Sequence, residues 1–109
     1  MTNYTVDSAR WSRMNIFEQM GNIYGEVGRS YNAKRSGRVS DVNLATERAI
    51  DLFDATIASL VQKKSVQAKE VLRAKDQFLS NLYDEFDEKD ASSLEKYFLE
   101  FAVAARLNV

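Results

Sequence analysis

Carboxylates and cations are the side chains in this sequence that could do chemistry, because histidine and cysteine are both absent. Without cysteine there is no thiolate nucleophile, no disulfide and no thiolate-bound metal. Without histidine the usual general base near neutral pH and the commonest metal ligand are missing. The composition therefore predicts a protein that is not an enzyme and that holds no cofactor and no metal ion.

The carboxylates form no recognisable metal motif. The run at residues 84–90 holds five of them, but it lacks the glycine and the ligand spacing of a calcium loop. We expect a solvated loop there; a weak cation site or an ionic contact with another molecule are the alternatives. Di-iron bundles use Glu-x-x-His pairs, and the remaining candidates lie on the expected outer faces of helices. These are Glu26, Glu47, Asp51 and Asp54.

A short basic run follows the first apolar stretch of the chain. It consists of Arg29, Lys34, Arg35 and Arg38. Cations at the end of a helix complement the helix dipole, which is the structural interpretation. The functional interpretation is a small patch for phosphate or RNA, with Tyr31 available for stacking. The formal net charge of −1 argues against a protein that coats nucleic acid.

Lys75 falls in the middle of an apolar helix face, between Leu72, Phe78 and Leu79. Burial of an unpaired ammonium group is costly. We expect Lys75 to be partly buried, either extending toward an end of the bundle or forming a buried ion pair with a carboxylate. No neighbouring acid–base group suggests that this lysine is a nucleophile.

Two further patterns suggest association of helices. Gly21, Gly25 and Gly28 share one helix face, although each glycine costs roughly 1 kcal/mol relative to alanine inside a helix. Close packing within the bundle, a second subunit's helix or a kink would explain them. In the last helix, Leu99, Val103 and Leu107 form a second apolar stripe, which either the end of the first helix or a second subunit would cover.

Apolar residues recur at spacings of three and four throughout the 109 residues, which indicates amphipathic helices. We expect helices over residues 8–34, 42–61, 66–83 and 92–107, with Gly37 as a left-handed cap after the first and a capping box at the start of the last. Short connections favour an up-down four-helix bundle with a long first helix. Residues 1–109 are expected to form one domain.

No apolar run reaches the length of a signal peptide core or a membrane span. We therefore expect a cytoplasmic protein that does not enter a membrane. The absence of cysteine fits that location.

Several segments resemble a family of small uncharacterised bacterial and archaeal all-α proteins. They are residues 11–23, 26–29, 45–54, 69–76 and 96–98, together with Phe101 and residues 104–106. The architecture is similar, more distantly, to the HEPN and ribosomal intervening-sequence four-helix bundles. Active HEPN ribonucleases carry an arginine followed a few residues later by a histidine, which this chain lacks. The resemblance thus implies an inactive, accessory or self-associating bundle.

Two functional hypotheses follow. The first is a non-enzymatic helical bundle that self-associates, most simply as a two-fold dimer, or binds a protein partner. The second is a nucleic-acid or nucleotide-binding accessory protein that uses the basic run. The resemblance in fold supports this second hypothesis by analogy alone.

Overall fold

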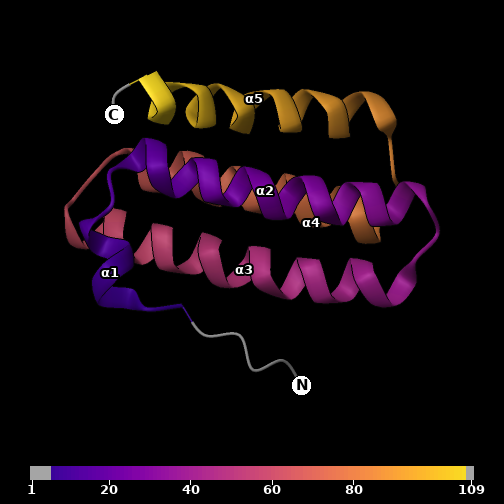
Figure 1. The fold of residues 1–109 in the computed structure, drawn as a ribbon, viewed down its shortest axis with the longest axis horizontal. Coiled ribbons are helices and arrows are strands. Elements are labelled where there is room, and N and C mark those ends of the chain that lie inside the picture. The colour runs from indigo at the N-terminus through magenta and orange to yellow at the C-terminus, as the bar shows by residue number, and fades with distance from the viewer. Residues whose placement is uncertain (1–5, 108–109) are drawn as a thin grey trace.

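The structure, a computed structural model, describes residues 6–107. They form five helices: α1 (Ser8–Arg13), α2 (Ile16–Arg35), α3 (Val39–Gln62), α4 (Gln67–Tyr83) and α5 (Glu88–Leu107). No strand occurs within this range, so the expected all-α fold is confirmed. The four long helices run in alternating directions along the long axis, and α1 turns away from the start of α2 (Figure 1). None of these helices is both long enough and apolar enough to cross a bilayer.

The prediction of one long first helix over residues 8–34 is wrong, because the helix is interrupted before Asn15. The Asn15 side chain accepts a hydrogen bond from the Glu18 backbone N–H at 2.8 Å, and the Glu18 carboxylate accepts one from the Asn15 N–H at 3.1 Å. This reciprocal capping box begins a new helix. The break lets α1 turn onto α3, where the buried Trp11 indole donates to Thr56 Oγ1 at 2.8 Å.

The turns on both sides of α3 have the same hydrogen-bond pattern. Gly37 adopts φ +72°, as expected for a left-handed cap, and the Arg38 N–H donates to the Ala33 carbonyl at 3.0 Å. After α3, Lys64 adopts φ +56°, and the Ser65 N–H donates back to the helix at 2.9 Å. Both are Schellman-type endings, and they reverse the chain twice within a few residues.

The last helix begins at Glu88 rather than at the expected Ser92. The Asp87 carboxylate accepts from the backbone N–H groups of Lys89 and Asp90 at 2.9 and 3.2 Å. It therefore caps the helix in place of Ser92. Residues 88–90 of the acidic run are consequently helical although exposed, and only residues 84–87 lie in the loop that the sequence suggested.

The core is built around an aromatic cluster to which each long helix contributes one ring. Phe53 of α3 lies with its ring centroid 5.8 Å from that of Phe78 and 5.7 Å from that of Phe98, and Tyr31 lies 5.6 Å from Phe78. All four side chains are fully buried. Burial raises the pKa of Tyr31 to about 12, against a hydrogen bond from Asn81 that lowers it. Because Tyr31 is fully buried, the suggestion that it is available for stacking on a base is wrong.

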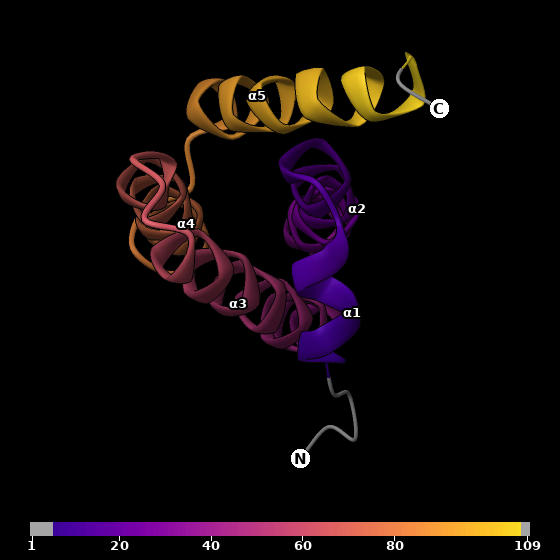
Figure 2. The ribbon, with the colours of Figure 1, turned by 90° about the vertical axis from the view of Figure 1, so that its left-hand side faces the viewer.

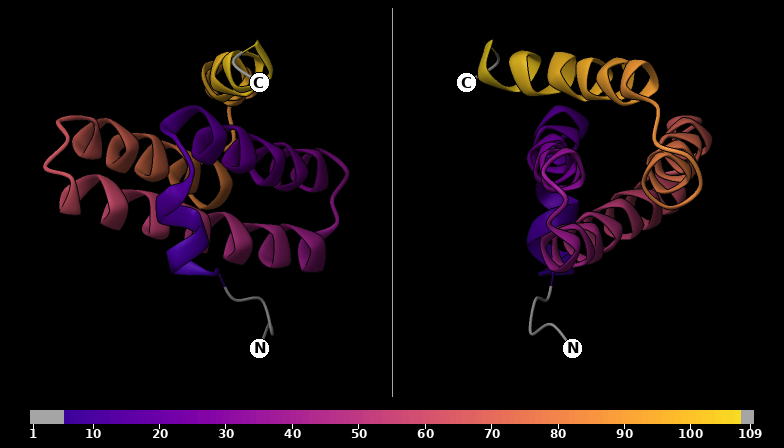
Figure 3. Two further views of the ribbon diagram at one scale, coloured as in Figure 1. Left: turned by 60° about the vertical axis from the view of Figure 1, so that its left-hand side comes forward. Right: turned by 90° about the vertical axis from the view of Figure 1, so that its right-hand side faces the viewer.

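The position of α5 differs from that of the other long helices. It starts above α4, passes across α2 and continues beyond it (Figure 2). The view from the opposite side shows the same overhang, with α2 below the middle of α5 and the end of α5 projecting past it (Figure 3). The two halves of α5 consequently have different neighbours, and this determines which surfaces remain open.

Candidate functional site

Helices α2 and α5 approach each other closely at Gly21. A Cβ atom at this position would lie 3.2 Å from the Cα atom of Ala102, so the glycine lets the two backbones pack together. At Gly25 the nearest atom to such a Cβ belongs to the Arg29 side chain at 3.8 Å, and at Gly28 nothing lies within 4 Å. One glycine of the three thus serves packing within the chain. The surface at Gly28 is open, whereas the Arg29 side chain lies beside Gly25.

A groove of about 610 Å³ runs between α2 and the C-terminal half of α5, and we call it the α2–α5 groove. Its walls are mainly small and apolar residues with charged groups at the rim. They are Glu18, Gly21, Asn22, Tyr24, Leu99, Ala102, Val103, Ala105 and Arg106. The groove brings one of the expected glycines together with two members of the second apolar stripe. Sequence reasoning missed Ala102, because nothing in the pattern identifies which small residue faces which glycine.

The second apolar stripe of α5 is open to solvent. Leu99 is 41% exposed, Val103 47% and Leu107 79%. The alternative that the first helix covers this stripe is wrong, because the helix break turns α1 onto α3 instead. On the core-facing side of α5, Phe17 of α2 is 36% exposed, and its ring packs 6.2 Å from that of Phe101.

The N-terminal half of α5 is held by Arg35. Its guanidinium group donates to Glu88 at 2.8 and 2.7 Å and to Glu95 at 2.6 Å. It also lies 5.8 Å from the ring centroid of Tyr31 and 6.0 Å from that of Phe86. The hydrogen bond from Arg35 lowers the pKa of Glu88 and raises that of Arg35 itself. Arg35 is therefore committed to α5 and does not join the other cations of the basic run.

The remaining members of the basic run separate onto two surfaces. Arg29 pairs with Glu26 at 2.7 Å, and Arg38 pairs with Asp41 at 2.9 Å. Both arginines line a hollow of about 400 Å³ together with Arg48, which comes from α3. Sequence reasoning missed Arg48, which lies ten positions after Arg38 on α3 and reaches the same hollow as Arg29 only because α2 and α3 pack together.

Lys34 lies elsewhere. It lines a smaller hollow of about 260 Å³ with the apolar residues Val39, Val42 and Leu82. The single basic patch expected from the sequence is thus not formed as one surface.

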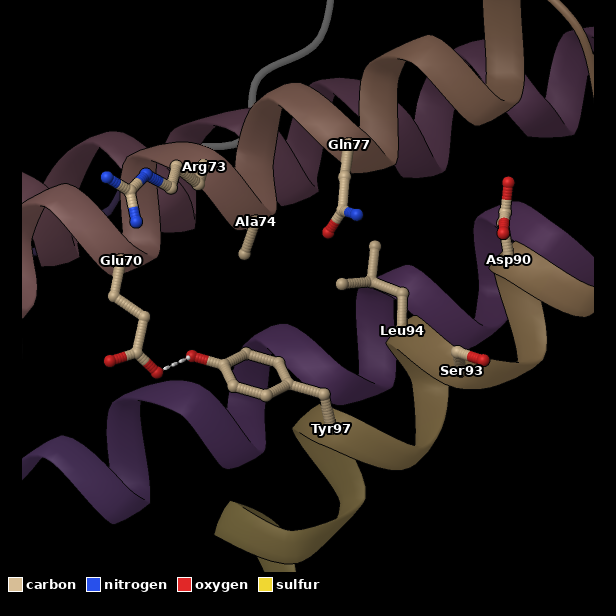
Figure 4. A pocket seen from close by; sticks show the side chains of 8 residues that line it. All are labelled: Glu70, Arg73, Ala74, Gln77, Asp90, Ser93, Leu94 and Tyr97. Atoms are coloured by element: carbon tan, nitrogen blue, oxygen red, sulfur yellow. Dashed lines mark hydrogen bonds between the residues drawn. The ribbon is translucent and has the colours of Figure 1, made fainter.

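A third hollow, of about 280 Å³, lies between α4 and α5 (Figure 4). Across one end, the Tyr97 hydroxyl donates to the Glu70 carboxylate. Burial, reinforced by this hydrogen bond to a carboxylate, raises the pKa of Tyr97. Tyr97 therefore stays protonated and ties α5 to α4 as a donor, which is a structural role.

Lys75 links α4 to α3. Its Nζ atom lies 2.7 Å from Asp54 Oδ1, and its side chain is 20% exposed, whereas that of Asp54 is 57% exposed. Leu72, which the helical wheel placed on the same inner face as Lys75, is instead 46% exposed. The ammonium group thus sits at the edge of the core, with its carboxylate partner facing solvent.

No group of three or more carboxylates is placed to hold a metal ion within residues 6–107. Comparison with known proteins finds no matching family model, no similar curated protein and no similar solved structure. Function must therefore be argued from the surfaces of this chain alone.

Proposed function

We propose that this protein is a non-enzymatic helical module that self-associates as a two-fold dimer through the exposed stripe of α5 and the α2–α5 groove. In this proposal α2 to α5 form an up-down four-helix bundle with α1 as an appendage. The location remains the cytoplasmic one expected from the sequence. A different protein that binds the same surface is the alternative partner.

The observation that carries the proposal is that α5 is apolar on two faces. Ala91, Leu94 and Phe98 fill the core, while Leu99 and Val103 face outward and are nearly half exposed. A helix that only covers a core needs one apolar stripe. Contiguous exposed apolar surface on a soluble protein marks an interaction site.

The symmetry of the stripe favours a second copy of the chain as the partner. An isologous interface requires a patch that complements itself. Apolar residues lie four positions before and four positions after Val103. An antiparallel pairing of two α5 helices about Val103 therefore places Leu99 opposite the partner's Leu107, and apolar groups meet along the whole contact.

The glycines of α2 complement this arrangement. Gly28 lies on the same helix face as Gly21, and nothing lies within 4 Å of a Cβ atom placed there. A second helix can therefore approach the α2 backbone beside the groove. The free energy available is modest, roughly 1–2 kcal/mol for each outer side chain of α5 that becomes buried, so we expect a dimer that forms at micromolar concentrations.

Sedimentation equilibrium tests the proposal over protein concentrations from about 1 to 100 µM. The wild type should show a mass that rises toward twice the 12.4 kDa chain mass, and Leu99→Glu should remain at the monomer mass. Leu72→Glu is the matched control, because Leu72 is a leucine of similar exposure, 46%, on α4. A wild type that stays monomeric throughout, or a Leu99→Glu variant that dimerises as well as Leu72→Glu, would falsify the proposal.

A further inference from the structure

The hollow between the end of α2 and the start of α3 concentrates arginines. Its lining includes Arg29, Arg38 and Arg48 but only one carboxylate, Asp41. A small apolar floor, with Ala33, Ala45 and Leu44, completes it. Its volume of about 400 Å³ lies within the range of clefts that hold small ligands.

Two of the arginines are positioned by carboxylates without using all their donors. Arg29 reaches Glu26 through Nη1, and Arg38 reaches Asp41 through Nη1. A guanidinium group has five N–H donors in a planar fork, so each ion pair fixes the group while other N–H bonds can serve a ligand. Glu26 is itself 9% exposed, which makes it a firm anchor for Arg29.

The dipole of α3 adds to the positive charge of these arginines. Arg38 is the N-cap residue of α3, and no side chain caps that end of the helix. Arg38 and Asp41, at the first turn of this 24-residue helix, line the hollow, so the partial positive charge of the helix end lies nearby. Planar arginine forks beside a helix N-terminus match the geometry of phosphate oxygens.

We propose that this hollow, the three-arginine hollow, binds the phosphate groups of a small phosphorylated molecule. Arg48 adds a third guanidinium group to the lining of the hollow, and Arg29 and Arg38 supply the flanking forks. Tyr31 is buried and offers no stacking surface, so the phosphate rather than a base is the group that is recognised. This site is separate from the α2–α5 groove and does not depend on self-association.

Titration with inorganic pyrophosphate tests the site, by calorimetry and by phosphorus NMR at low and at moderate salt. We expect saturable binding that weakens with salt. Arg48→Gln and Arg38→Gln should each weaken it about tenfold or more, because each removes charge-assisted hydrogen bonds to the phosphate oxygens. ADP should show the same dependence on these arginines.

Lys34→Gln is the matched control, because Lys34 belongs to the same basic run but lines a different hollow. It should change pyrophosphate binding less than twofold. The proposal is overturned if the wild type does not bind pyrophosphate at millimolar concentration. It is also overturned if Lys34→Gln weakens binding as much as Arg48→Gln, or if a single-stranded RNA binds where pyrophosphate does not. Sedimentation of Arg48→Gln should show the wild-type mass, which separates this result from the dimer proposal.

Discussion

The two halves of α5 belong to one unbroken helix, yet they serve different ends. In residues 88–98 the inward side chains are buried, and Arg35 and Tyr97 tie the helix to α2 and α4. In residues 99–107 no side chain is fully buried, although Phe101 still packs at the edge of the core, and the helix rests on α2 near Gly21 with apolar groups facing outward. The first half of α5 therefore contributes to the folded core, whereas the second half presents an exposed apolar surface.

The largest expected effect is a difference in the free energy of unfolding between substitutions at Phe98 and Leu99, which are adjacent but lie in different halves of α5. Phe98→Ala should lower the free energy of unfolding by about 3–5 kcal/mol, because a fully buried ring is lost from the aromatic cluster. Leu99→Ala should lower it by less than about 1 kcal/mol. Urea denaturation at a concentration where the protein is monomeric measures both, and equal losses would contradict the division of α5.

The next effect concerns the contact between α2 and the second half of α5. Gly21→Val should cost about 1–3 kcal/mol, because the new side chain meets the backbone of Ala102. Gly28→Ala is the control in the same helix: its Cβ enters open space, and the gain in helix propensity should stabilise the protein by about 0.5–1 kcal/mol. Thermal unfolding of both variants compares them; destabilisation by Gly28→Ala would indicate a neighbour that the fold does not show.

A smaller effect is expected where the first half of α5 is fixed by charge. Arg35→Gln should lower the free energy of unfolding by about 1 kcal/mol, because partly exposed ion pairs contribute modestly. The loss should be pH-dependent. Glu88 has a folded pKa below its ordinary value of 4.5, so its pairing stabilises the protein above that pH and is lost as the pH falls through the folded pKa.

Urea midpoints measured from pH 7 to pH 3 check this sign. The difference between wild type and Arg35→Gln should be largest at neutral pH and should shrink below about pH 4.5. A difference that grows as the pH falls would show that Glu88 is not stabilised by Arg35.

The smallest expected effect is that of the ion pair between α3 and α4. A double-mutant cycle on Lys75→Met and Asp54→Ala should give a coupling of about 0.2–1 kcal/mol, because the Asp54 carboxylate is more than half exposed. The double variant should be close to the wild type in stability, since methionine retains much of the packing. Coupling above about 2 kcal/mol would mean that the pair is more deeply desolvated than its exposure indicates.

Periodicity identified the helical segments because the buried residues of α2, α3 and α4 recur at helical spacing. It failed at Asn15, where the apolar pattern continues across a break. Local capping by the Asn15 and Glu18 side chains ended one helix and began another. A local cap also set the start of α5. The Asp87 side chain caps the helix, so α5 begins at Glu88 and not at Ser92.

The candidate surfaces could be predicted only in part. The exposed stripe of α5 was visible as an apolar pattern on the second helix face, which is a local property. The three-arginine hollow was not, because Arg29 of α2 joins Arg38, the N-cap of α3, and Arg48 of α3 only after the two helices pack side by side. Arg35 was misassigned for the same reason: its partners Glu88 and Glu95 are more than fifty positions away.

The burial of Trp11 has a practical consequence for experiments on this chain. It is the sole tryptophan, it is 7% exposed, and its indole N–H is bonded to Thr56 on α3. Its fluorescence emission therefore reports whether α1 is docked, at a point remote from α5. A red shift during unfolding marks release of α1. Because α1 and α5 lie on opposite sides of α2 (Figure 2), dissociation of the proposed dimer should leave the emission wavelength unchanged, so one optical signal would distinguish loss of fold from loss of the proposed assembly.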